Sequence, residues 1–336
     1  MKRTSLPLQR RQFITLLGSA AAWPVAAQAQ QSNRMRRLGV LMGFAEEDQE
    51  AQARVAEFKQ ALEGLGWTNG RNIEFNYRWT LGDADRMRVY ARELVQLAPD
   101  VILSATTPAL AAARQETGTV PIVFVNVTDP VGSGLVANLA RPGGNITGFS
   151  NFEPLMGGKW VQLLKELAPH VTQIALMSNP EVEPQTRSYA SSIEVAAVSL
   201  AVKPIAAPIH DSAEIEGAIA TLAREPGTGL IVLSGLFTFA YRELIAGLAD
   251  RYGVPAVYPY REFVQSGGLL SYGIDLAAPF RQAAPYVDRI LRGEKPGDLP
   301  VQQPTKFQLV INLKTARMLG LEVPPTLLAR ADEVIE

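Results

Sequence analysis

Hydroxyl-bearing residues cluster where a short apolar run gives way to a helical pattern. Ser104, Thr106, Thr107 and Pro108 stand within five positions, directly after the apolar residues 101–103. Proline favours the first helical turn and threonine is a common N-cap, so we expect Thr107 to cap a helix beginning near Pro108. Free N–H groups at a helix N-terminus, together with hydroxyls, can hold a carboxylate without a formal positive charge. This cluster predicts an anion site, although capping alone would also explain Thr107.

Further polar and aromatic residues follow other predicted strands, and ligands of open parallel sheets bind beyond those strand ends. The additional candidates for ligand binding are Phe44, Thr128, Asp129, Ser150, Asn151, Gly235, Phe237, Tyr258, Tyr272 and Asp275. The rings would supply apolar faces. Each acid has a structural alternative, because Asp129 before Pro130 can shape a turn and Asp275 can cap a helix.

Strand-like and helix-like patterns alternate along the chain, which is typical of parallel α/β architecture. We expect strands at 38–42, 73–79, 101–104, 122–127, 174–177, 202–209, 230–233, 256–258, 269–272 and 307–312. We expect helices at 47–65, 84–97, 108–117, 156–167, 185–200, 213–224, 240–252 and 279–291. The pattern restarts near Gly148, which predicts two doubly wound parallel-sheet lobes joined by a hinge.

The predicted N-terminal lobe comprises residues 34–148 and 276–298, and the predicted C-terminal lobe comprises residues 149–275 and 299–336. We expect the hinge at 148–151, 273–275 and 299–303, where the chain crosses between the lobes.

The first 29 residues have the order of a secretory signal. Arg10 and Arg11 precede a weakly apolar run, 13–25, which ends in the small-x-small site at Ala27 and Ala29. Paired arginines before Phe13 resemble a twin-arginine signal, and the run is shorter than the ~20 residues of a membrane span. We therefore expect cleavage near Ala29 and a periplasmic protein without membrane insertion, since the chain has no cysteine to lipidate.

Charge excludes one class of partner. The full chain has a formal net charge of −1, and the first 29 residues carry four basic side chains and no acid, so the chain from Gln30 has −1 − 4 = −5. A mildly acidic protein is a poor candidate for binding nucleic acid, because contacts with the phosphate backbone need clustered lysine and arginine side chains.

An enzyme is the main alternative class. Residues 132–137 match the G-x-G-x-x-A dinucleotide fingerprint, but they follow Asp129 and Pro130 deep inside a lobe, away from the first strand and helix. The sequence has no G-x-S-x-G elbow, and His170 and His210 do not form a metal-ligand spacing. We expect no catalytic residue, metal or cofactor.

Four segments resemble a known family: DPVGSGLV at 129–136, RPGGNITG at 141–148, YPYREF at 258–263 and FQLVINLKTA at 307–316. Together they are similar to ABC-transporter substrate-binding proteins of the type I periplasmic-binding fold, tryptophan/tyrosine type. The resemblance implies a receptor that delivers a small carboxylate-bearing solute, an amino acid or an aromatic acid, to an ABC permease in the inner membrane. A receptor that senses its ligand for a membrane signalling protein remains an alternative.

The resemblance also implies roles for the candidate residues. In binding proteins of this fold for amino acids, the ligand carboxylate meets hydroxyls and amides of the first lobe, which matches Ser104, Thr106, Thr107 and Thr128. The ammonium meets an acid, for which Asp275 and Asp129 are the candidates.

Overall fold

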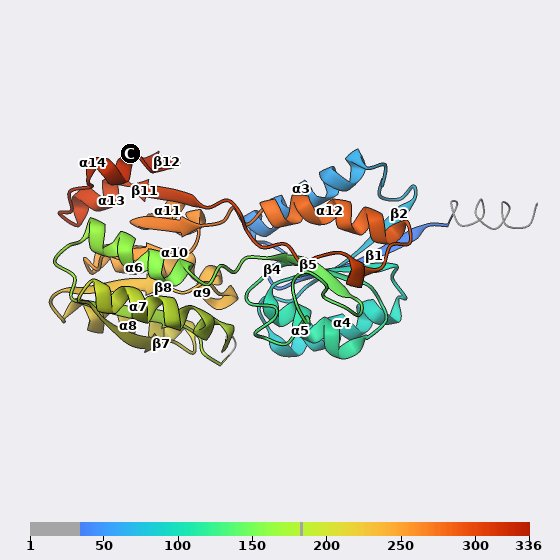
Figure 1. Cartoon of the computed structure of the whole chain (residues 1–336), viewed down its shortest axis with the longest axis horizontal. Helices are drawn as coiled ribbons and strands as arrows, with labels where there is room; N and C mark the ends of the chain where they lie inside the picture. Colours follow the sequence, from blue (N-terminus) through green and yellow to red (C-terminus); the bar gives the residue numbers. More distant parts are fainter. Residues whose placement is uncertain (1–33, 182–183) are drawn as a thin grey trace, which may run out of the picture.

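The computed structural model describes residues 34–181 and 184–336, so the predicted signal at 1–29 lies outside the described residues. Two lobes lie side by side along the long axis of the molecule, each built on its own sheet (Figure 1). The chain passes between the lobes after β5, after β10 and before β11. The two-lobed α/β architecture predicted from the sequence is confirmed.

The first lobe has a parallel five-stranded sheet. In spatial order its strands are β2 (Ile73–Trp79), β1 (Arg36–Met42), β3 (Val101–Ala105), β4 (Ile122–Val127) and β5 (Ile146–Ser150). Its helices are α3 (Gln49–Gly64), α4 (Ala84–Gln96), α5 (Thr107–Glu116) and α12 (Ala278–Leu291), followed by the 3-10 turn η2 (Pro296–Asp298). Helices α3 and α12 cover one face of the sheet, and α4 and α5 cover the other (Figure 1).

Burial on both faces explains why the central strands β3 and β4 consist mostly of apolar residues. Every residue of β3 and β4 is buried, including Ser104 and Asn126. The prediction of strands at 73–79 and 122–127 matches β2 and β4 in every residue.

The second lobe has a seven-stranded sheet, parallel except where β11 runs antiparallel to β10. In spatial order its strands are β12 (Glu333–Ile335), β11 (Gln308–Asn312), β10 (Leu270–Gly273), β9 (Ala256–Tyr258), β8 (Thr228–Val232), β6 (Gln173–Ser178) and β7 (Lys203–Pro208). Its α-helices are α6 (Met156–Leu167), α7 (Ala190–Ser199), α8 (Ser212–Ala223), α9 (Leu236–Ala240), α10 (Arg242–Arg251), α11 (Arg261–Gln265), α13 (Leu313–Met318) and α14 (Pro325–Leu328). A 3-10 turn, η1 (Pro184–Tyr189), precedes α7.

The structure differs from the predicted elements at the crossings. Residues 146–150, expected to begin the crossing, form a fifth strand of the first sheet, which therefore extends two residues beyond the predicted boundary at 148. Residues 299–302 remain with the first lobe, because Val301 N donates to Leu139 O (2.7 Å) and Gln302 N to Gly148 O (2.9 Å). These two crossings therefore begin later along the chain than the sequence pattern indicated.

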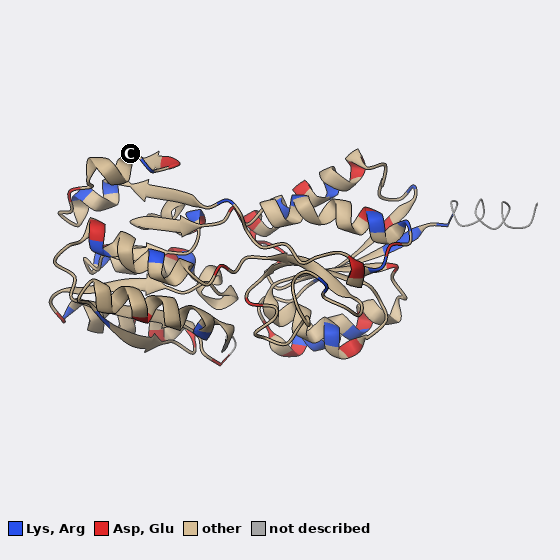
Figure 2. Cartoon of the chain, in the orientation of Figure 1, with Lys and Arg blue, Asp and Glu red and all other residues tan. Residues whose placement is uncertain are grey.

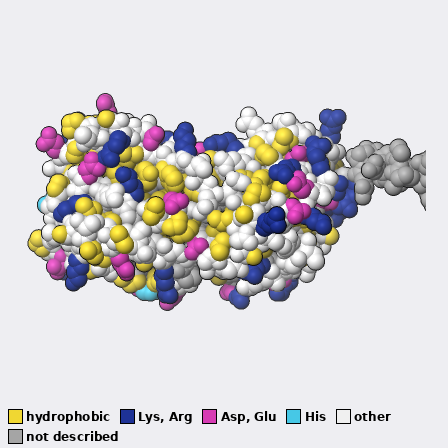
Figure 3. Space-filling view, in the orientation of Figure 1, with side chains coloured by type: hydrophobic (Ala, Val, Ile, Leu, Met, Phe, Trp, Pro, Cys, Tyr) yellow, Lys and Arg dark blue, Asp and Glu magenta, His cyan; other side chains and the backbone are white. Residues whose placement is uncertain are grey.

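Charges of both signs are distributed over the outer helices of both lobes (Figure 2). On the face seen in Figure 3, lysine and arginine side chains are interspersed with aspartate and glutamate side chains. Within 34–181 and 184–336, no helix is long and apolar enough to cross a membrane. The same residues contain no group of three or more histidines or acids placed to hold a metal ion.

Candidate ligand-binding site

A small cavity lies between the lobes, where the carboxyl ends of β1, β3, β4, β8 and β9 converge. Its volume is about 30 Å³, room for about one water molecule. The lining residues are Phe44, Thr106, Thr107, Pro108, Asn126, Thr128, Asn151, Gln185, Ser234, Gly235, Leu236, Phe239, Tyr260 and Leu276. They come from both lobes, so the lobes are closed around this cavity.

Two lining residues combine backbone strain with an unpaired buried polar atom. Thr106 has φ 93° and Asn126 has φ 54°, a region that non-glycine residues seldom occupy. Both residues are 6% exposed, and Thr106 Oγ1 and Asn126 Oδ1 have no hydrogen-bond partner among the described residues. Strain and unsatisfied polar atoms at one place are typical of a ligand site.

Glycine at position 43 makes room for Thr106. A Cβ at that position would lie 2.5 Å from Thr106 Oγ1 and 3.0 Å from its Cγ2. The position of the Thr106 side chain therefore depends on glycine directly after β1.

A chain of hydrogen bonds spans the cavity. Thr128 N donates to Thr107 Oγ1 (3.0 Å), and Thr128 Oγ1 donates to Asn151 Oδ1 (3.0 Å). Asn151 Nδ2 donates to Tyr260 Oη (2.9 Å), which also makes a close hydrogen bond with Ser234 Oγ. These hydrogen bonds thus connect the first lobe, the crossing residue Asn151 and the second lobe.

The Thr107 prediction needs a correction. Helix α5 begins at Thr107, its N-cap is Thr106, and neither makes a side-chain capping bond. Thr107 Oγ1 instead accepts the hydrogen bond from Thr128 N, because the end of β4 lies beside the first turn of α5.

Aromatic rings close one side of the cavity. The ring of Phe44, from the first lobe, meets that of Phe239, from the second, edge-on with centroids 5.7 Å apart. The Arg54 guanidinium lies 4.8 Å from the Phe239 centroid and 5.4 Å from that of Phe44. These contacts continue the apolar core of the first lobe into the second.

Two buried tyrosines hold neutral hydroxyls at this site. Burial raises the pKa of Tyr260 to about 12, against the opposing effect of hydrogen bonds with Ser234 and Asn151. Burial, with the nearby Tyr260, raises the pKa of Tyr189 well above its usual value. Both hydroxyls therefore stay protonated at neutral pH.

The structure brings six of the predicted residues to the cavity: Phe44, Thr106, Thr107, Thr128, Asn151 and Gly235. It places the other seven elsewhere. Ser104 is fully buried within β3, and Ser150 turns away to donate to Val127 O (2.8 Å). Phe237 lies at the cleft mouth, on Tyr241.

The two predicted acids already have partners outside the cavity. Asp129 accepts from Gly132 N (2.9 Å) and from Ser188 Oγ (2.5 Å). Asp275 accepts from Ala277 N (2.9 Å) and forms an ion pair with Arg281 (2.5 Å) beside the crossing. Burial alone would raise the pKa of Asp275, but the bonds from Arg281 and Ala277 outweigh it and lower the pKa.

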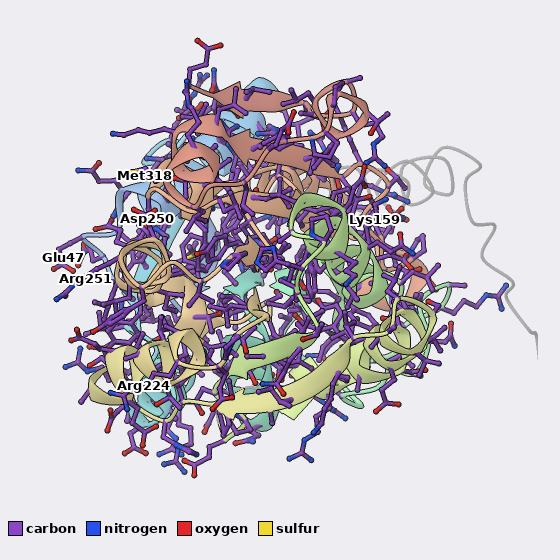
Figure 4. The ribbon with its side chains drawn as sticks, turned by 90° about the vertical axis from the view of Figure 1, so that its left-hand side faces the viewer. Glu47, Lys159, Arg224, Asp250, Arg251 and Met318 are labelled. Atoms are coloured by element: carbon purple, nitrogen blue, oxygen red, sulfur yellow. The ribbon has the colours of Figure 1, made fainter. Side chains whose placement is uncertain are left out.

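The two predicted tyrosines also lie apart from the cavity. Tyr258 is buried in the second lobe, stacked on Phe263 with centroids 5.0 Å apart. Tyr272 stacks on Phe307 in a groove of the second lobe, with Lys159 above its ring, and Figure 4 labels that lysine on α6.

Several lining residues were not among those predicted from the sequence, notably Asn126, Ser234, Phe239 and Tyr260. Tyr260 was two positions from the chosen Tyr258, and both lie in the YPYREF segment. Asn126 and Ser234 each stand at a strand end, which is the signal that could have identified them.

A larger hollow of about 930 Å³ opens beside the cavity and shares Phe44, Pro108 and Leu236 with it. Its rim carries charged side chains, including Asp48, Arg88 and Glu181. This hollow is the mouth of the cleft.

The chain resembles solved and characterised proteins along most of its length. A crystal structure of a conserved domain protein from Vibrio cholerae is 31% identical, with a TM-score of 0.83 over 90% of this chain and 100% of that chain. An ABC domain from Streptococcus pneumonia in complex with L-Trp is 23% identical, with the same TM-score over 90% and 100% of the two chains. The tyrosine-binding protein of Clostridioides difficile is 28% identical over 79% of this chain and 76% of its own length.

The structural similarity and the match to a family model point to the same class of protein. More distant structures, such as a solute-binding protein from Agrobacterium vitis with bound allitol (15% identity, TM-score 0.60, 83% of this chain and 96% of that chain), share the two-lobed fold alone. The family described as ABC transporter substrate binding protein matches residues 42–335. The resemblance seen in the sequence is therefore confirmed: this chain belongs to the ABC transporter substrate-binding family, whose members are binding proteins rather than enzymes.

Proposed function

We propose that this protein is the periplasmic solute-binding component of an ABC importer, and that it binds a small carboxylate-bearing solute, an amino acid or an aromatic acid, between its lobes. The pair of strained, unpaired polar residues in the inter-lobe cavity, Thr106 and Asn126, carries this proposal. The family supports the importer role, since its members serve ABC transporters outside the cytoplasm. Relatives named for tyrosine and L-Trp support the ligand class.

The carboxylate would bind at the start of α5. The first-turn N–H groups of a helix lack intrahelical acceptors, and the helix dipole favours an anion there. Thr106 Oγ1 is buried beside this turn without a partner among the described residues, so it is available as a donor. The rings of Phe44 and Phe239 would cover the apolar part of the solute.

Binding would require the lobes to part. A cavity of about 30 Å³ is far smaller than the roughly 300–1,000 Å³ of ordinary ligand pockets. The solute would enter from the mouth with the lobes apart, and closure would be favoured only by contacts that the closed state adds. A permease in the inner membrane would then receive the solute from the closed form.

A thermal-shift screen of the purified chain tests the ligand class. We expect aromatic amino acids or aromatic acids to raise the melting temperature, because a ligand that binds only the folded state stabilises it. Thr106→Val, which keeps the shape and removes the hydroxyl, should lower the affinity measured by calorimetry. A screen in which only sugars or nucleotides stabilise the chain would refute the proposed ligand class.

Export can be tested separately. Arg10→Lys together with Arg11→Lys should trap the protein in the cytoplasm if 1–29 is a twin-arginine signal. Cell fractionation with mass spectrometry of the N-terminus would show whether the exported form begins at Gln30. Export of the double variant at the normal rate would exclude the twin-arginine route.

A further inference from the structure

The side-chain amide of Asn126 has one permitted orientation. Its Nδ2 donates to Leu276 O at 3.0 Å. A carbonyl oxygen only accepts, so turning the amide over would bring two acceptors face to face. Asn126 Oδ1 must therefore point the other way, where it is buried and has no donor among the described residues.

The backbone holds this amide in place. The pairing of β4 with β5 changes register between Val125 and Val127, which leaves Asn126 as the extra residue of a bulge. Bulges re-aim a side chain, and asparagine tolerates the left-handed φ of 54° better than most residues. Asn126 is thus fixed with an unused acceptor in the wall of the cavity.

We infer that Asn126 Oδ1 receives the ammonium group of the ligand, so that the solute is an α-amino acid rather than an aromatic acid without an amine. This inference rests on the proposed function. An ammonium group is a donor without acceptor capacity, and it complements a buried acceptor that lacks a donor. Asp129 and Asp275 are each engaged by two protein donors outside the cavity, whereas Asn126 Oδ1 is buried in the cavity wall.

The spacing suits the two charged groups of an amino acid. Ala105 of β3 pairs with Val125 of β4, and Thr106 N, directly after β3, donates to Val125 O (3.1 Å), so Thr106 lies beside the end of β4 where Asn126 stands. Neighbouring strands lie about 4.8 Å apart. A carboxylate at Thr106 and an ammonium at Asn126 can therefore belong to substituents of one α-carbon.

The test compares ligands that differ only in the amine: L-tyrosine with 3-(4-hydroxyphenyl)propanoate, and L-tryptophan with indole-3-propanoate. Isothermal calorimetry on the wild-type chain should show a preference for the amino acid of roughly ten- to a hundred-fold, the value of a hydrogen bond to a charged group. Asn126→Gly accepts the positive φ and removes the amide. In that variant the preference for the amino acid over the matching acid should disappear.

A control is Ser271→Ala, which removes another buried polar atom, a hydroxyl without a partner among the described residues, in β10 and away from the cavity. It should leave both affinities unchanged. Circular dichroism would establish that the Asn126→Gly variant is folded, and the wild-type comparison is informative by itself if it is not.

Each outcome decides between the two proposals. Equal wild-type affinity for both members of a pair, or a preference that survives in Asn126→Gly, would overturn the role of Asn126 and leave the carboxylate site standing. Failure of all four compounds to bind would overturn the aromatic ligand class, and the role of Asn126 with it. A preference for the amino acid that is lost in Asn126→Gly but retained in Ser271→Ala would support both the proposed ligand class and the role of Asn126.

Discussion

The guanidinium of Arg54, in α3 of the first lobe, lies 2.8 Å from the carboxylate of Glu262, in α11 of the second lobe. Both side chains are nearly sealed from solvent, at 2% and 7% exposure. Burial raises the pKa of Glu262, and the positive charge of Arg54 opposes that rise. This ion pair exists only when the lobes are together. Separating the lobes would break the pair and expose both charges to water.

Removing one charge of this pair should open the protein. Glu262→Gln leaves Arg54 buried without its counter-ion, a cost of about 3–5 kcal/mol in other proteins. Parting the lobes would rehydrate Arg54, so we expect a larger radius of gyration by small-angle X-ray scattering without ligand. Arg54→Met combined with Glu262→Met should restore the compact form.

The control for this prediction is Glu166→Gln, which breaks the exposed ion pair with Arg330 inside the second lobe. Exposed pairs contribute about 0–1 kcal/mol, so scattering should not change. An unchanged radius in Glu262→Gln would show that the Arg54 pair does not govern closure.

Thr107→Ala should destabilise the first lobe. The change leaves the buried N–H of Thr128 without its acceptor, which costs about 1–3 kcal/mol. Thr107→Ser keeps the oxygen and should retain most of the stability. Urea denaturation of the three proteins measures the difference, and equal midpoints would indicate that water replaces the lost bond.

Gly148→Ala should be strongly destabilising. A Cβ there would lie 2.1 Å from Phe124 O, and φ is 154°, which disfavours any side chain. Overpacking of this kind costs about 1–3 kcal/mol or more. Gly118→Ala is the matched control, since its Cβ would meet nothing within 4 Å and its φ is ordinary. Similar melting temperatures for both variants would contradict the close approach of β5 to β4.

Alkaline pH should weaken the fold through Tyr260. The unfolded side chain ionises near pH 10, but burial raises the pKa of the folded one to about 12. Between these values the folded state binds more protons than the unfolded state. The contribution to stability is therefore complete below about pH 10 and is lost as pH rises towards 12.

The slope from one such tyrosine is at most about 1.4 kcal/mol per pH unit. Chemical denaturation from pH 9 to 12 should show a smaller slope in Tyr260→Phe than in the wild type, and absorbance at 295 nm would follow ionisation. Identical slopes would mean that Tyr260 titrates normally.

Most strands of both sheets could be predicted from the sequence, because buried parallel strands are rich in apolar residues. The strands predicted at 256–258 and 122–127 coincide with β9 and β4. Strand β5 was missed because Gly148, inside it, also fits a turn, and only contact with the Phe124 backbone shows why glycine stands there. The short edge strand β12 and helices α9, α11 and α14 carry too few residues for a periodic signal.

Part of the site followed from one rule, that ligands bind beyond strand ends. The rule led to Thr106 and Thr128, which line the cavity. It also led to Tyr258, but that ring belongs to a strand residue and packs into the core, whereas Tyr260 lies two residues later and reaches the cavity. Sequence position alone does not show which of two nearby rings points inward.

The sequence by itself determined the two-lobed fold, the family and the location of the cavity at strand ends, because apolar periodicity and strand–helix alternation are local properties of the chain. The tertiary structure decided which polar atoms are unpaired. Asp275 is a candidate partner for an ammonium group by residue type, but its carboxylate pairs with Arg281, whereas the amide of Asn126 is oriented by its hydrogen bond to Leu276 O. Hydrogen-bond satisfaction depends on residues distant in sequence, so it is established only when the lobes and crossings are in place.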